Sequence, residues 1–138
     1  MAILNRLFQV TLVPIGLSLL IAAAFPPEYG SKGMVASDHP LASKAGAAIL
    51  KKGGHAVDAV IATALAAGVV QPASSGLGGG GFAVVQMKGD APFVLDFRER
   101  APKAADRDIF VNSTKPQASQ LGGLAVAIPG EAQGLAAL

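Results

Sequence analysis

The residues best suited to recognise a ligand lie in the stretch Asp96–Glu99, which follows an apolar run. Arg98 stands at the end of the strand expected there, and its neighbour Phe97 should face the opposite side. An arginine at a strand end can bind a planar carboxylate through two parallel hydrogen bonds. The same arginine could instead form a structural salt bridge with Asp96, Glu99 or a more distant acid. Spacing alone favours the salt bridge, because most charges near strand ends are paired or solvated.

The second candidate is the run Gly76–Gly81, which holds five glycines in six positions and fits the spacing G-x-G-x-x-G. A dinucleotide site needs a strand before this run and a helix after it, because the pyrophosphate sits on the helix N-terminus. Here a helix precedes and a strand follows, so the sequence argues against a dinucleotide site. The run also lacks the Gly-Lys-Ser/Thr ending of a phosphate-binding P-loop. What it permits is close approach of the backbone to another segment or to an anion.

The remaining polar residues offer no catalytic machinery. His39 and His55 have no metal-ligand companion at a useful spacing, which favours a structural or solvated role for each. Ser74 and Ser75 have no base nearby in the sequence, and no G-x-S-x-G elbow is present. The threonines, which fall in an expected signal, a buried helix and a polar loop, do not look like activated nucleophiles: Thr11, Thr63 and Thr114.

Composition narrows the class of protein. The chain has 138 residues, which suggests at most one domain, and a formal net charge of +2. That charge is too small to indicate nucleic-acid binding, which needs clustered Lys and Arg. The absence of cysteine excludes disulfides, thiolate metal sites and a cysteine nucleophile. No cofactor and no metal is predicted.

The N-terminal residues have the order of a secretory signal. Met1–Arg6 is positively charged, Leu7–Leu20 is mainly apolar, and Ala22–Ala24 supplies small residues for cleavage near Ala24. We therefore predict a signal peptide over residues 1–24 and a periplasmic or secreted protein. An uncleaved membrane anchor is the alternative, since the apolar run approaches the roughly 20 residues that span a bilayer.

After a linker over residues 25–32, the pattern predicts a short strand over Gly33–Ala36 and then a helix that starts near Pro40 and stops at Gly53-Gly54. A second helix is predicted over Ala56–Val69. It is apolar nearly all round, so it should be buried on several sides. Asp58 lies in its first turn, where the helix dipole favours an anion, and a structural role there is preferred to a catalytic one.

The second half of the chain predicts a β-hairpin. Its strands are Phe82–Met87 and Phe93–Phe97, joined by a turn over Lys88–Asp90. Residues 103–123 should be irregular, with one helical turn near residues 108–110. A strand is predicted over Leu124–Ile128, and a helix should start at Glu131.

An isolated hairpin is marginally stable, and the apolar helix needs covering on every side. The final helix also stops after about two turns without a capping residue. We therefore expect a truncated chain whose partners lie outside it.

Several motifs in one order resemble the gamma-glutamyltransferase family, also called glutathione hydrolases. The resemblance covers residues 33–138 and is carried by Gly33–Ser37, His39–Ser43, Gly53-Gly54 leading into Ala56–Ala59, Ser74–Gly80, Asp96–Glu99 with Ala101-Pro102, and Leu121–Leu135. One small departure is His55, where a small polar residue is expected.

The resemblance implies an α+β fold that forms the N-terminal part of an αββα N-terminal-nucleophile hydrolase sandwich, incomplete in this chain. It implies a precursor that cuts itself into a large and a small subunit, with this chain in the large one. The new N-terminal Thr of the small subunit attacks the gamma-glutamyl amide, and water or an acceptor amine then takes the glutamyl group. Partners would be glutathione, other gamma-glutamyl compounds and the missing small subunit.

By the same resemblance, Arg98 would bind the α-carboxylate of the substrate, which reverses the preference for a salt bridge. No processing site for the nucleophilic Thr occurs in the chain, so residues 25–138 alone should be inactive. A non-catalytic relic or binding fragment is the alternative. An acylase of the same fold is a weaker one, against which the glycine run and the Asp96–Glu99 motif argue.

Overall fold

The computed structural model describes residues 27–138. The predicted signal peptide and the start of the linker lie outside the described residues. The chain divides into two units, Met1–Met34 and Val35–Leu138. The strand predicted over Gly33–Ala36 is wrong, because no segment within residues 27–138 pairs with these residues and their backbone has no regular structure. Within residues 27–138, no helix combines the length and apolar character needed to cross a membrane.

Two helices form the first half of the larger unit. Helix α2 spans Pro40–Lys51 and helix α3 spans Ala56–Val70, which confirms both predicted helices with one residue added at the end of the second. Pro40 occupies the first helical position of α2, where its missing N–H removes no hydrogen bond. Gly53 follows α2 with a left-handed backbone, φ +92°, as the predicted helix stop requires.

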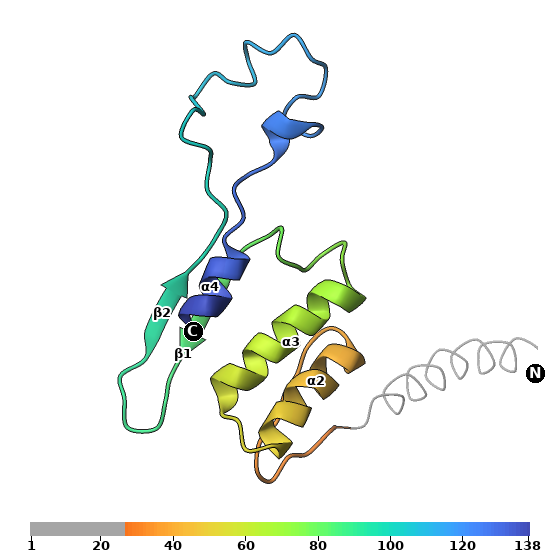
Figure 1. Cartoon of the computed structure of the whole chain (residues 1–138), viewed down its shortest axis with the longest axis vertical. Coiled ribbons are helices and arrows are strands. Elements are labelled where there is room, and N and C mark those ends of the chain that lie inside the picture. The colour runs from red at the N-terminus through yellow and green to blue at the C-terminus, as the bar shows by residue number, and fades with distance from the viewer. Residues whose placement is uncertain (1–26) are drawn as a thin grey trace, which may run out of the picture. The chain divides into compact units, whose positions relative to one another are not determined.

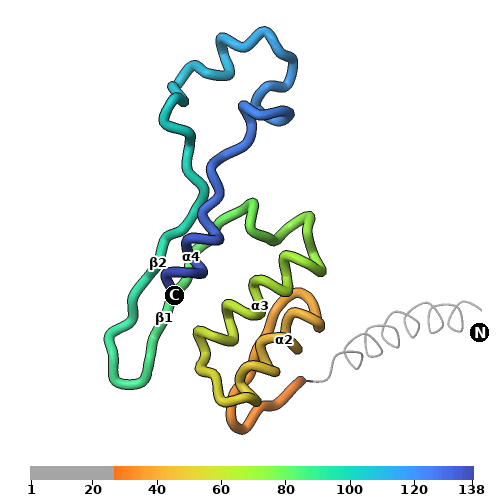
Figure 2. The backbone as a smooth tube through the Cα atoms, viewed as in Figure 1, coloured from red at the N-terminus to blue at the C-terminus, as the bar shows by residue number. Residues whose placement is uncertain are grey.

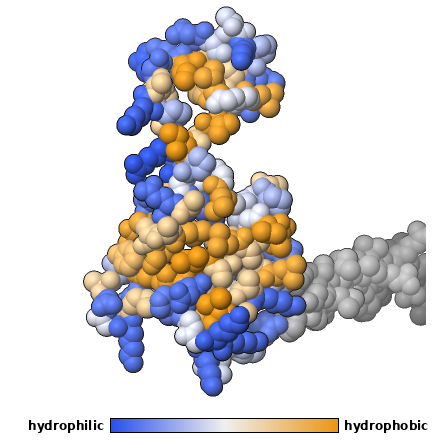
Figure 3. Space-filling view, viewed as in Figure 1, coloured by the Kyte–Doolittle hydropathy of each residue, from blue (hydrophilic) through white to orange (hydrophobic). Residues whose placement is uncertain are grey.

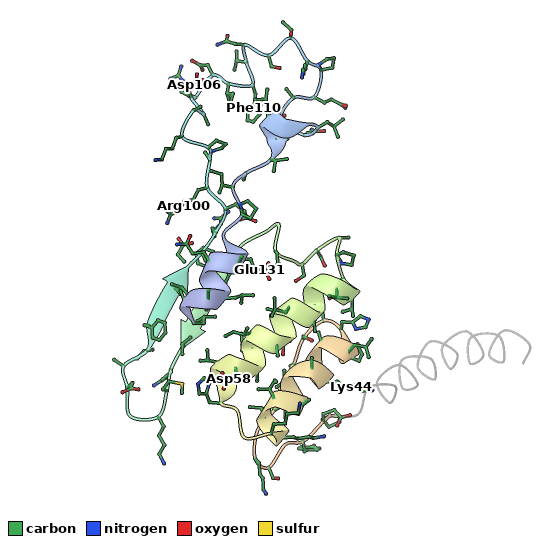
Figure 4. All side chains as sticks on the ribbon, viewed as in Figure 1. Lys44, Asp58, Arg100, Asp106, Phe110 and Glu131 are labelled. Carbon is green, nitrogen blue, oxygen red and sulfur yellow. The ribbon has the colours of Figure 1, made fainter. Side chains whose placement is uncertain are left out.

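Both helices are capped at their N-termini by histidine. The Nδ1 atom of His39 accepts the Leu41 N–H at 3.2 Å, and the Nδ1 atom of His55 accepts the Asp58 N–H at 3.3 Å. Asp58 completes a capping box, since its Oδ2 accepts the His55 N–H at 3.0 Å (Figure 4). The structural roles predicted for both histidines and for Asp58 are confirmed.

Helices α2 and α3 lie side by side (Figure 1), and small residues fill their interface. Ala42 of α2 and Ala59 of α3 are fully or almost fully buried. Gly46 is buried against Thr63, whose Oγ1 donates to the Ala59 carbonyl at 2.7 Å. These side chains are small enough to let the two backbones approach closely.

The prediction that α3 is buried on several sides is wrong for the described residues. Only α2 packs along it extensively, and its Val60 and Val69 remain 51% and 80% exposed. Apolar side chains therefore gather on the surface (Figure 3). Phe82 and Val84 of the hairpin are exposed as well. The sequence shows that the residues of α3 are apolar, but an apolar residue is buried only where a neighbouring element covers it.

The predicted hairpin is confirmed with shorter strands. Strand β1 (Phe82–Val85) pairs antiparallel with β2 (Phe93–Asp96), so that Phe82 lies opposite Asp96 and Val85 opposite Phe93. The turn is closed by the Asp90 N–H, which donates to the Met87 carbonyl at 3.2 Å.

The chain then leaves the hairpin and returns beside it (Figure 2), and residues 101–122 form turns. The Asn112 N–H donates to the Asp108 carbonyl at 3.0 Å, which confirms the single helical turn predicted near residues 108–110. The strand predicted over Leu124–Ile128 is wrong, since Gly123–Ala125 forms a short 3-10 helix and only Ile128 makes a single bridge, to Arg100. Helix α4 spans Glu131–Ala137 and starts where predicted. The described part is thus an α+β arrangement.

Candidate functional site

The glycine run joins two segments that are distant in the sequence. The Gly79 carbonyl accepts the N–H of Gly130 at 2.9 Å and the N–H of Glu131 at 3.0 Å. The Gly81 N–H and carbonyl bond the carbonyl and N–H of Phe97 at 3.4 and 3.0 Å. The loop therefore ties the end of β2 to the start of α4 through backbone groups, as the predicted close backbone approach requires.

Gly80 shows why a side chain is excluded from this loop. A Cβ atom on Gly80 would lie 2.9 Å from the Arg98 Cα and 2.9 Å from the Glu99 nitrogen. Both are backbone atoms, which cannot move aside as the end of a flexible side chain can. The position of Arg98 is thus set by backbone contacts rather than by its own side chain.

Helix α4 packs closely against the same strand end, at Phe97. Gly130, just before α4, has no room for a Cβ because backbone atoms of Phe97 occupy that space. Gly134, within α4, has no room for one because the Phe97 side chain lies there. Phe97 is half-buried there, whereas Arg98 is exposed. The two neighbours consequently serve different purposes: Phe97 anchors the strand end and Arg98 presents its charge to solvent.

Arg98 has no carboxylate partner among residues 27–138, where the arginine that does pair with a carboxylate is Arg107, with Asp108. Its guanidinium carbon lies 5.7 Å from the centre of the Phe82 ring, a cation–π contact.

The acid beside Arg98 is engaged with its backbone. Asp96 Oδ1 accepts the Arg98 N–H at 3.0 Å. The alternative of a salt bridge to Asp96 or Glu99 is therefore not realised in the described part of the chain. The guanidinium is left available for another anion.

Two grooves flank this strand end. One, of about 180 Å³, is lined by Arg98 and Arg100 together with Asp96 and uncharged residues of α4 and its lead-in. The other, of about 520 Å³, is lined by the glycine loop, apolar residues of α3 and the carboxylates of Glu99 and Glu131. Successive side chains of an extended segment point to opposite sides, which separates the basic groove from the acidic one.

Glu131 is a feature that the sequence reasoning missed. It is 8% exposed, the most buried charged residue in the described part, and stands at the start of α4 (Figure 4). The Pro129-Gly130 pair before it was the available signal, because it marks a helix start and places the next residue in the first turn.

The other candidates take no part in this arrangement. Thr63 is bonded within α3, and His39 and His55 cap helices. Ser74 and Ser75 line the acidic groove, and neither is paired with a histidine in the described residues. In residues 27–138, no three His, Cys, Asp or Glu side chains gather as a metal site would require.

The site is thus an exposed arginine at the end of a strand that a glycine loop holds, within an α+β framework. The family model described as Gamma-glutamyltranspeptidase matches residues 42–138. The chain therefore belongs to the gamma-glutamyltranspeptidase family.

Individual relatives agree. The chain is similar to Glutathione hydrolase 3 of Arabidopsis thaliana, with 46% identity over 75% of this chain and 16% of that protein. It is 38% identical to the glutathione hydrolase proenzyme of Pseudomonas sp. (strain A14), over 95% of this chain and 24% of that protein. The crystal structure of Helicobacter pylori gamma-glutamyltranspeptidase superposes with a TM-score of 0.75 and 40% identity, covering 81% of this chain and 33% of the other. The chain thus spans less than a quarter of the length of these two curated relatives.

Proposed function

We propose that this chain contributes the substrate-carboxylate clamp to an exported enzyme that cleaves gamma-glutamyl amides such as glutathione. The glutamyl group would pass to water or to the amine of an amino acid or peptide. The proposal rests on family membership, together with the similarity to proteins named glutathione hydrolase. The periplasm or the extracellular space is the proposed location.

Arg98 is proposed as the residue that binds the α-carboxylate of the glutamyl group. The observation that carries this is the exposed guanidinium without an acidic partner in the described residues. A planar guanidinium can donate two parallel hydrogen bonds to a carboxylate, which fixes the orientation of the ligand as well as its charge. Backbone contacts of the glycine loop hold the strand end, so the Arg98 side chain, but not the backbone that carries it, has to be ordered on binding.

The nucleophile is proposed to come from polypeptide outside this chain. In the complete protein, the N-terminal Thr of a small subunit would attack the gamma-glutamyl carbonyl with its own α-amine as the base. The two helices and the hairpin would then form part of an αββα sandwich, in which further elements cover the apolar surfaces of α3 and β1. Arg98 would hold the glutamyl group while the amide bond breaks.

The test is steady-state kinetics of gamma-glutamyl hydrolysis in a full-length protein that carries this segment. Arg98→Ala should lower kcat/KM by at least about 30-fold, equivalent to about 2 kcal/mol, because a charged hydrogen-bonded partner of the substrate is lost. Arg98→Lys should have a kcat/KM between those of the unmodified protein and Arg98→Ala, because lysine keeps the charge but cannot donate two parallel hydrogen bonds from a planar group. Arg107→Ala is the matched control, because that side chain is 93% exposed and outside both grooves. Unchanged KM and kcat in Arg98→Ala would contradict the clamp.

A further inference from the structure

The groove beside the proposed clamp contains a second arginine that the proposed reaction does not use. Arg98 and Arg100 both line the groove of about 180 Å³. In an extended segment, residues two apart face the same side, and their Cα atoms lie roughly 7 Å apart. Two arginines of one strand end thus line the same groove.

The backbone of Arg100 is fixed in place. Its N–H donates to the Ile128 carbonyl at 3.0 Å, and its carbonyl accepts the Ile128 N–H at 2.8 Å. These two hydrogen bonds join the segment that leaves the hairpin to the segment that returns toward α4, at the place where Figure 4 labels Arg100. The side chain is exposed. The backbone of Arg100 is therefore fixed by hydrogen bonds, whereas its charged side chain is exposed to solvent.

The charges of the groove do not balance. Asp96 is the single acid that lines it, and one of its oxygens accepts the Arg98 N–H. In residues 27–138, Arg100, like Arg98, forms no ion pair with a carboxylate. The other lining residues, Gln133 among them, are uncharged. Two guanidiniums with so little compensation favour a ligand that brings two separate anionic groups.

We propose that Arg100 binds the C-terminal carboxylate of a gamma-glutamyl peptide while Arg98 binds the α-carboxylate of its glutamyl end. A gamma-glutamyl peptide carries these two carboxylates at its opposite ends, which suits two arginine side chains that start roughly 7 Å apart and are long enough to diverge. The consequence is specificity: the site prefers gamma-glutamyl peptides with a free C-terminus to neutral gamma-glutamyl amides. This inference rests on the proposed function.

The experiment compares two substrates that differ by one charge: glutathione and glutathione whose glycine carboxylate is converted to the amide. Hydrolysis is measured in a full-length protein that carries this segment. We expect the unmodified protein to favour the free acid by about tenfold in kcat/KM, a typical value for a partly exposed charged hydrogen bond. Arg100→Ala should bring the two substrates within about twofold by lowering kcat/KM for the free acid only. Arg100→Lys should keep part of the preference.

Equal losses on both substrates in Arg100→Ala would overturn the inference, because they would indicate a structural role for the residue. No loss on either substrate would overturn it as well.

Arg98→Ala separates this inference from the proposed function, since it should lower kcat/KM for both substrates alike. If Arg98→Ala lowers kcat/KM and Arg100→Ala still prefers the free acid, the role proposed for Arg98 stands and the role proposed for Arg100 fails. If neither the unmodified protein nor any variant cleaves gamma-glutamyl bonds, the proposed function itself fails. Arg107→Ala should show the preference of the unmodified protein.

Discussion

Gly46→Ala is expected to destabilise the packing of α2 against α3. Intrinsic helix propensity alone predicts the opposite, because alanine in a helix interior is favoured over glycine by about 1 kcal/mol. At Gly46, however, a Cβ would lie 2.8 Å from the Ala59 carbonyl oxygen and 2.9 Å from Val35 Cγ1, and it would also collide with Thr63 Oγ1. The substitution therefore sets a local gain against a packing cost, and the sign of the change reports which is larger.

The packing cost is expected to be larger. Thr63 cannot easily rotate away, because its Oγ1 donates to Ala59 at 2.7 Å. The Ala59 oxygen is backbone, so relief requires the two helices to separate. Inserting a methyl group into a tight interface typically costs 1–3 kcal/mol, and more where backbone must move. Because backbone must move here, the cost should lie in the upper part of that range, about 2–3 kcal/mol. With the propensity gain of about 1 kcal/mol subtracted, Gly46→Ala should lower the free energy of unfolding by roughly 1–2 kcal/mol.

Chemical denaturation followed by far-UV circular dichroism measures this difference. Ala48→Gly in the same helix is the matched control, since Ala48 is exposed and its change reports the propensity term alone. A Gly46→Ala protein that is about 1 kcal/mol more stable than the unmodified one would refute the reasoning, because propensity would then account for the whole effect.

Two further predictions concern the helix cap and the activity of the chain. His39→Ala should lower the free energy of unfolding by about 1 kcal/mol and His39→Asn should largely restore it, because the Asn oxygen can accept the Leu41 N–H; equal losses in both variants, measured by denaturation, would refute the capping role. Purified residues 25–138 should release no measurable glutamate from glutathione, since the proposed nucleophile lies outside them; hydrolysis well above a no-protein control would contradict this.

Local signals predicted the helices and the turn of the hairpin well. Pro40 and Gly53 act through their own backbone preferences, so their effect can be seen in the sequence without knowledge of the fold. The strands predicted over Gly33–Ala36 and Leu124–Ile128 failed for the converse reason. A strand exists only where a second segment supplies hydrogen bonds, and the described residues supply one bridge, at Ile128.

The candidate site divides in the same way. Arg98 could be singled out because its chemistry is visible in its residue type and its position at a strand end. For Glu131, the Pro129-Gly130 pair indicates its place in the first turn of a helix but not its burial, because the contact of Gly79 with the start of α4 is formed only in the fold. Histidine as a helix cap was also missed, since Ser, Thr, Asp and Asn are the usual caps, although Nδ1 can accept the same hydrogen bond.

The glycine run explains why these pieces meet. Its carbonyls and amides bond the end of β2 and the start of α4, two segments more than thirty positions apart in the chain. Side chains in the run would keep those backbones apart, as the short distances from Gly80 to Arg98 and Glu99 demonstrate. We therefore propose that the run positions Arg98, and Gly80→Ala should lower kcat/KM for gamma-glutamyl substrates as Arg98→Ala does while leaving the charge in the chain.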